Sequence, residues 1–366
     1  MKTVRRLLYR DIVSSVFFVA LAFLSLFFFI DLVDQLDGLG QRGRTVTIAV
    51  LTALYAAPGH AYELMPIAVL IGTIYALARM AQSSEFTILR TGGLGPKRAL
   101  LLLAALGVGF AALTFVLGDV VAPFSERQAV LLKAQAGGGL RLSGPGAWLK
   151  EKRPGPEGEH AISANVGGLT GDGTLQSVRI FEFDAGGRLL RRVAAATARV
   201  EDDRSWRLRD AEELVWPADG GVATTTRVAE LRWPSTLDAA VVAAALLPAE
   251  TMTTLELWRY SSHLEDQDQA AQRYELQFWK RALYPLACLV MVALALPFAY
   301  LQARAGGVSL KVFGGIMLGI SFVLLNNIAG HLGVLSDLTP WMVSAAPGLV
   351  YLLLSLAAFA WLVRYR

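Results

Sequence analysis

Long apolar stretches without charged residues recur along the chain and are separated by short polar segments. Five of them have about the 20 residues that an α-helix needs to cross the apolar core of a bilayer. They occupy residues 12–30, 99–118, 282–303, 312–330 and 338–363. The pattern therefore predicts five transmembrane helices.

A sixth apolar stretch, residues 45–78, has a different length. Its 34 residues contain one acid, Glu63, and two prolines, Pro58 and Pro66. As a helix it would be about 51 Å long, which is too long for one straight crossing and too short for two crossings with a turn. We predict one tilted or broken span, whose first turns project from the membrane or lie along its interface.

The sequence between the third and fourth spans has a shorter period. The run LQSVRIFEFDAGGRLLRRVAAATARVEDDRSWRLRDAEELVW alternates apolar and β-branched stretches with turn signals such as FDAGGR. Repeated hairpins of this spacing suggest a β-sandwich or an open jelly roll. We expect a membrane α-helical protein with six transmembrane helices and an inserted all-β, jelly-roll-like domain, divided into residues 1–125, 126–270 and 271–366.

Composition and charge placement give the orientation. The 366 residues are 54% hydrophobic, with a mean hydropathy of +0.47 and a net charge of +4. Twelve basic residues lie on the side of the spans that holds both termini, beside two acids. By the positive-inside rule both termini are cytoplasmic and the β domain is periplasmic. The basic excess thus belongs to the membrane, and the sequence predicts no nucleic-acid partner.

Catalytic and metal-binding motifs do not occur in the sequence. It has no G-x-x-x-x-G-K-[ST] loop, H-E-x-x-H, C-x-x-C or G-x-S-x-G, and its four histidines are scattered. These absences argue against a nucleotide site, a zinc site or a nucleophile elbow in this chain. Three polar features remain inside or near the spans: Glu63 as a cation or proton site or an interfacial residue, the pair Asp31 and Asp34, and Asn326 with Asn327 as helix contacts or a polar path.

A short polar segment, ARMAQSSEFTILRTGG, occupies residues 78–93 between the second and third spans. Ser83 or Ser84 can cap a short helix there, and Gly92 with Gly93 can end it. Glu85 would lie in its first turn. The segment is either a solvated connection or a contact for a cytoplasmic partner.

Four stretches carry a resemblance to a known family. They are VDQL at 33–36, LARMAQSSEFTILRTGG at 77–93, DVVAPFSERQAVLLKAQA at 119–136 and RYELQFWKRALYPLA at 273–287. Together with three spans on each side of a β insert, they resemble the LptF/LptG family of lipopolysaccharide-export permeases. The VDQL run, the entry into the fourth span and the short C-terminal tail are most like its LptG branch.

The resemblance implies a permease subunit of an ABC transporter in the bacterial inner membrane. Such a subunit extracts lipopolysaccharide from that membrane and passes it to a periplasmic bridge toward the outer membrane. The implied partners are an LptF-like chain, two copies of an LptB-like ATPase, and LptC-like and LptA-like jelly-roll proteins. The chain would then be non-catalytic and bind no cofactor itself, with ATP and Mg bound by the ATPase.

The resemblance also implies site residues. A coupling helix near 83–91 would contact the ATPase through Ser84, Glu85, Phe86, Ile88, Leu89 and Arg90. Candidates for lipid contact are Phe27, Ile30, Asp31, Asp34, Arg42, Arg44, Leu64, Arg127, Lys133 and Asn326. One departure stands out: lysines of LptG relatives at the outer end of the first span are replaced here by Asp31 and the run DGLG, so their role cannot be carried over.

Two other classes of function are compatible with the spans alone. One is an ion-coupled secondary transporter that uses Glu63, Asp31 and Asp34, although repeated broken spans are not evident. The other is a structural anchor for envelope assembly. Co-purification with an ATPase and a homologous six-span chain is expected only of the exporter.

Overall fold

The computed structural model describes residues 2–36, 45–93, 95–136, 140–141, 146–155, 158–170, 173–201, 205–217, 222–237, 242, 249–266, 271–300, 307–335 and 338–364. Over these residues six helical segments are long and apolar enough to cross a membrane. They are α1 (Lys2–Leu36), α2 (Val46–Gln82), α4 (Pro96–Val116) with its continuation, α8 (Gln272–Tyr300), α9 (Val308–Leu335) and α10 (Pro340–Arg364). The six predicted spans are confirmed.

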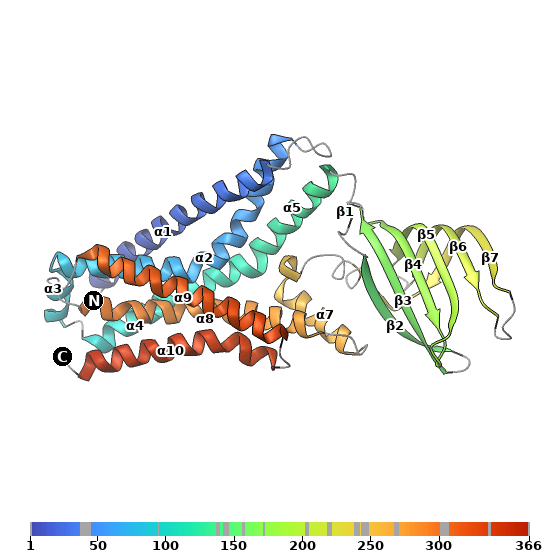
Figure 1. Ribbon diagram of the computed structural model, residues 1–366. Helices are drawn as coiled ribbons and strands as arrows, with labels where there is room; N and C mark the ends of the chain where they lie inside the picture. The colour runs from blue at the N-terminus through green and yellow to red at the C-terminus, as the bar shows by residue number, and fades with distance from the viewer. Residues whose placement is uncertain are drawn as a thin grey trace. The chain divides into compact units, whose positions relative to one another are not determined.

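The sixth apolar stretch is one continuous helix, α2, of 37 residues with Pro58 and Pro66 inside it. Figure 1 shows that α2 changes direction along its length, as expected of a helix that lacks backbone donors at two positions. Its second half is the centre of the bundle, where Leu70, Ile74 and Leu77 are fully buried.

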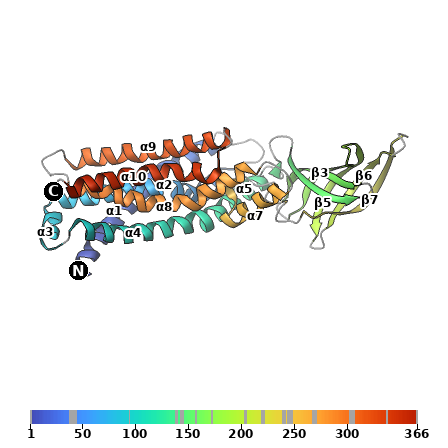
Figure 2. The same ribbon diagram turned by 90° about the horizontal axis from the view of Figure 1, so that it is seen from below.

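The chain divides into two compact units. The helical unit comprises residues 1–34, 53–125 and 272–366, and the sheet unit comprises residues 35–52 and 126–271. Within the helical unit, α4, α8 and α10 run side by side (Figures 1 and 2). A π-helical turn, η1 (Leu117–Val121), joins α4 to α5 (Ala122–Ala136).

Small residues bring the helices of this unit close together. A Cβ on Gly72 of α2 would lie 2.6 Å from the Val16 backbone of α1. A Cβ on Gly107 of α4 would lie 3.1 Å from the Leu289 Cα of α8. Close backbone approach at small residues is typical of helices in membranes, where the lipid supplies no hydrophobic drive for association.

The inserted domain is an antiparallel sheet. Its strands are β1 (Leu140–Arg141), β2 (Ala147–Gly155), β3 (Gly158–Leu169), β4 (Leu175–Phe183), β5 (Leu189–Glu201), β6 (Ser205–Val215) and β7 (Thr224–Pro234). They pair in the order β3-β4-β5-β6-β7, and both β1 and β2 pair with β3. The prediction of an inserted β domain is confirmed, with the described strands in one curved sheet (Figure 1).

One face of this sheet, the inner face, holds an apolar core. Residues alternate along each strand, so that Val178 and Ile180 point inward while Arg179 points outward. Trp206 of β6 is 1% exposed, and its indole N–H donates to the Leu237 carbonyl at 3.1 Å. The chain after β7 therefore returns across the inner face and covers part of it.

A polar cluster, here named the β2–β7 clasp, joins the two edges of the sheet. Ser235 Oγ donates to Glu151 Oε2 at 2.6 Å, and Arg153 of β2 donates to the Pro234 carbonyl. The Arg153 Cζ lies 5.5 Å and the Arg191 Cζ 4.4 Å from the centre of the Trp233 ring. Because two guanidiniums contact one indole, the clasp adds cation–π contacts to hydrogen bonds.

Candidate functional site

The polar segment after α2 forms a short helix, α3 (Glu85–Thr91). Phe86 is 4% exposed and packs edge to face on Tyr300 of α8, with 5.1 Å between ring centres. Glu85 is exposed, and Ile88 is 67% exposed. Phe86 therefore anchors α3 to the bundle, while Glu85 and Ile88 lie on its free surface.

The residues of the α3 segment that were expected to contact a partner differ in how exposed they are. Phe86 is buried among the chain's own helices, and Leu89 is half-buried against the same core, so contact of either with a partner stays a prediction. Ser84 has φ 64°, and the Ser83 hydroxyl donates back to the Met80 carbonyl at 3.3 Å, which stabilises the end of α2 rather than capping α3. The Arg90 side chain lies outside the described residues.

The C-terminal end of α1 meets α2 through a polar contact. Asp31 Oδ2 lies 2.8 Å from Nε2 of His60, and the Phe27 ring lies 4.9 Å from the His60 ring. Ile30 and Asp34 are exposed on the same helix. Asp31 thus has a side-chain partner on α2, a contact that spacing could not predict because the two residues lie on different helices.

Two neighbouring pockets lie among α2, α8, α9 and α10, and they are named here the polar and the apolar arm of one cavity because they share three lining residues. Its polar arm, of about 230 Å³, is lined by Tyr62, Glu63, Gln277, Lys280, Arg281, Tyr284, Val323, Asn326 and Asn327. The exposed residue Glu63 also contributes its backbone carbonyl, which accepts a hydrogen bond from the Tyr284 hydroxyl. Of the two readings of Asn326 and Asn327, their place in this lining favours a polar path.

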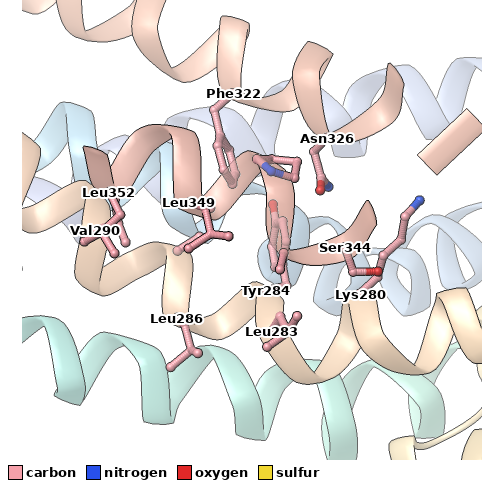
Figure 3. Close-up of a pocket in the computed structure, with 14 residues that line it drawn as sticks. Lys280, Leu283, Tyr284, Leu286, Val290, Phe322, Asn326, Ser344, Leu349 and Leu352 are labelled. Carbon is pink, nitrogen blue, oxygen red and sulfur yellow. The ribbon is translucent and has the colours of Figure 1, made fainter. Parts of the chain in front are cut away.

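The apolar arm, of about 190 Å³, opens from the same three residues, Lys280, Tyr284 and Asn326. Figure 3 shows Lys280, Ser344 and Asn326 at one end of this arm, with Val290 and Leu352 at the other. Its remaining walls are largely aliphatic, with Leu283, Leu286, Leu349 and Phe322 among them. Such a cavity suits an amphiphile, because a cation and amides stand at the mouth of an apolar groove.

The sequence comparisons agree with this architecture along the whole chain. The model of the family described as lipopolysaccharide export system permease LptF/LptG matches residues 6–363. The chain belongs to the LptF/LptG family. It is 27% identical over 352 residues to the lipopolysaccharide export system permease protein LptG of Escherichia coli strain K12, with 95% of each chain covered. It is 25% identical over 355 residues to the LptG protein of Haemophilus influenzae, with 96% of each covered.

In this LptF/LptG-family chain the lining of the cavity includes two basic residues, Lys280 and Arg281, that were not among the predicted site residues. Lys280 and Arg281 were missed because the fourth span was predicted to begin at residue 282, which left both outside the membrane. The helix in fact begins at Gln272, so it carries the basic pair into the bundle. The spacing Lys280, Leu283, Tyr284 and Ala287 was the available signal, since these positions share one face of a helix.

Other predicted lipid contacts lie elsewhere. Arg127 of α5 donates to Glu256 and, at 3.1 Å, to the Thr251 carbonyl, so its guanidinium is engaged within the sheet unit. Burial would raise the pKa of Glu256, but hydrogen bonds from the Thr253 N–H and Arg127 outweigh it and lower that pKa. Glu256 thereby caps α7 (Thr254–Asp266), which follows the 3-10 turn η2 (Ala249–Thr251).

The structure does not place the remaining predicted lipid contacts in the lining of the cavity. Leu64 is half-buried on α2, and it does not line either arm. Arg42 and Arg44 lie outside the described residues, as does the side chain of Lys133. Their contact with lipid stays a prediction.

Over the part of the chain that is described, no three His, Cys, Asp or Glu side chains gather in a way that could hold a metal ion.

Proposed function

We propose that this chain is the permease subunit of an ABC transporter that extracts lipopolysaccharide from the inner membrane. The observation that carries the proposal is the family match across residues 6–363, joined to a cavity with one polar and one apolar arm. In the predicted topology the ends of α8, α9 and α10 that form this cavity face the periplasm, because α8 follows the β domain in the chain. These helix ends would therefore lie in the outer leaflet of the inner membrane.

The two arms suit the two parts of such a lipid. Acyl chains gain about 0.8 kcal/mol for each CH₂ removed from water, so the aliphatic wall of Leu283, Leu286 and Leu349 favours them. The polar arm presents Lys280 and Arg281 to anionic phosphates, whose charge-assisted hydrogen bonds are stronger than neutral ones. These two basic residues take the place of the lysines that are missing at the outer end of α1.

The proposal includes partners. An LptF-like chain would complete the lipid path, two LptB-like ATPases would bind ATP and Mg, and LptC-like and LptA-like proteins would continue the route through the periplasm. Large exposed apolar side chains on α1 and α9, such as Phe18 at 72% and Leu324 at 55% exposure, face lipid or a second chain. The sheet unit would hand lipid to the bridge.

Photo-crosslinking tests the substrate and its route together. A photoreactive residue at position 349, in the apolar arm, is expected to capture lipopolysaccharide in cells. The matched control is position 101, a leucine of α4 that is 72% exposed and does not line the cavity. Lys280→Glu should reduce capture at 349 about tenfold, because it replaces a cation that faces phosphate by a carboxylate. Equal capture at both positions would exclude the cavity as the lipid site.

The coupling role of α3 is tested by Glu85→Arg. Reversing a charge that faces a cationic partner should reduce co-purification of the ATPase at least tenfold while leaving the chain in the membrane. Gln82→Arg is the matched control, since it adds the same charge at an exposed position before α3. If both variants retained the ATPase equally, Glu85 would have no part in coupling.

A further inference from the structure

The N-terminal part of α1 carries three exposed arginines, Arg5, Arg6 and Arg10. Arg10 forms an exposed ion pair with Asp11 at 3.4 Å. Over the described part of the chain, Arg5 and Arg6 form no ion pair. The side chains of residues 1–3 lie outside the description, and none of these three residues is acidic. The three guanidiniums are thus accompanied by one carboxylate, which leaves positive charge for a ligand.

The arginines surround an open recess of about 550 Å³. It is lined by Arg5, Arg6, Tyr9, Arg10 and Val13. The Tyr9 hydroxyl donates to the Leu102 carbonyl of α4 at 2.8 Å, and Leu8 is fully buried in the core of the helical unit. The helix that bears the arginines is therefore fixed against its neighbours, so the recess belongs to the folded bundle.

An apolar strip continues from the recess along α1. Val13 follows Arg6 by seven residues and Phe17 follows it by eleven, so all three lie on one face of the helix. Val13 and Phe17 are both exposed. Cations are thus followed by apolar side chains on the same face, in the order in which a phospholipid presents its phosphate and its acyl chains.

The predicted topology places this end of α1 at the cytoplasmic surface of the membrane. The start of α1, the short helix α3 and the end of α10 lie at the same end of the helical unit (Figures 1 and 2). Basic side chains next to a span on this side meet the headgroups of the cytoplasmic leaflet, and anionic headgroups attract them. The recess is therefore at the depth of lipid phosphates.

We propose that this recess binds the headgroup of an anionic phospholipid of the cytoplasmic leaflet, with an acyl chain along the strip of Val13 and Phe17. Guanidinium groups bind phosphate oxygens through paired, charge-assisted hydrogen bonds. A soluble phosphate would leave the strip uncovered, whereas an acyl chain covers it. The site shares no residue with the transmembrane cavity, and it rests on the predicted orientation of α1 rather than on the proposed function.

Native mass spectrometry of the purified full chain in an uncharged detergent tests the site. The probe is dioleoyl phosphatidylglycerol, and the zwitterionic control is dioleoyl phosphatidylcholine, which should bind at least tenfold more weakly. Replacing both free arginines, by Arg5→Gln with Arg6→Gln, should weaken binding of phosphatidylglycerol about tenfold or more. The matched control is Arg79→Gln with Arg364→Gln. It removes two exposed charges from the same predicted side, away from the recess, and should change affinity less than about twofold.

A gain of affinity separates the proposal from misfolding. Asp11→Asn removes the carboxylate that pairs with Arg10, so phosphatidylglycerol should bind about two- to threefold more tightly. An excess of glycerol 3-phosphate, which has the phosphate without acyl chains, should leave the bound lipid in place. Equal affinity for the two lipids, equal losses in the two double variants, weaker binding in Asp11→Asn, or displacement of the lipid by glycerol 3-phosphate would overturn the phospholipid site.

Discussion

The helical unit and the sheet unit place their large apolar side chains in opposite ways. On α1, Phe17 and Phe18 are 68% and 72% exposed, whereas Trp206 and Trp233 of the sheet are almost fully buried. The sheet instead presents arginines on its outer face. The comparison shows which solvent each unit meets, because an apolar surface is stable against lipid and a charged surface against water.

The two units also differ in what holds them together. The sheet is stabilised by bulky side chains that fill its inner face, so removing one leaves a cavity. The helices approach each other through glycines, so adding even one carbon creates a clash. Substitutions in opposite directions, from large to small and from small to large, should therefore affect the units differently.

The largest effect is expected from Trp206→Ala. It removes a fully buried indole and leaves the Leu237 carbonyl without its donor, at a cost of about 3–5 kcal/mol in the free energy of unfolding. Denaturant unfolding of the full chain in detergent, followed by tryptophan fluorescence, measures it. Phe17→Ala is the control and should change stability by less than about 0.5 kcal/mol, since Phe17 lies on the surface. Similar losses in both variants would contradict the comparison.

A smaller effect is expected from Gly72→Ala. The added Cβ would lie 2.6 Å from backbone atoms of Val16, which cannot move aside as a side chain can, so α1 and α2 must separate at a cost of about 1–3 kcal/mol. Thermal unfolding measured by loss of monodisperse protein checks this. Gly109→Ala, on α4 with open space around its Cβ, should be neutral or slightly stabilising. A neutral Gly72→Ala would mean that helix contact does not depend on the glycine.

The smallest effect is expected from Glu182→Gln in the sheet. Burial would raise the pKa of Glu182, but hydrogen bonds from His160 and Arg191 outweigh it and hold the pKa below its usual value. Because the pKa in the unfolded chain, about 4.3, is higher, the ionised group stabilises the fold above that pH. The stabilisation, about 1 kcal/mol, is lost as the pH falls from about 4.3 through the lower folded-state pKa.

Melting temperatures recorded between pH 3 and pH 7 would show this contribution. Glu182→Gln should lower the melting temperature near neutral pH and flatten its decline in acid. Glu212→Gln, which breaks an exposed pair with Arg227, should leave that decline unchanged. A Glu182→Gln profile that kept the full acid decline would show that other carboxylates cause it.

The periodicity of the sequence was sufficient to predict the helices and strands, but it did not predict which residues line the cavity. Uncharged length identified the six spans because an unpaired charge in lipid is costly, and alternation identified the strands. The search for uncharged stretches ended before Lys280 and Arg281, because hydropathy does not show that a helix can hold charged side chains inside a bundle. The burial of Phe86 against Tyr300 could not be predicted either, because a seven-residue helix has too few turns for its sequence to indicate which side is buried.

The β2–β7 clasp has a consequence for the order in which the sheet is completed. Ser235 and Glu151, which it joins, are 84 residues apart in the chain. Because synthesis delivers the chain from its N-terminus, β2 to β6 are made before the segment that covers them. Contacts between distant residues form slowly because the loop between them must close first. The apolar inner face is thus exposed while the sheet is still forming, at a stage when a chaperone could bind it.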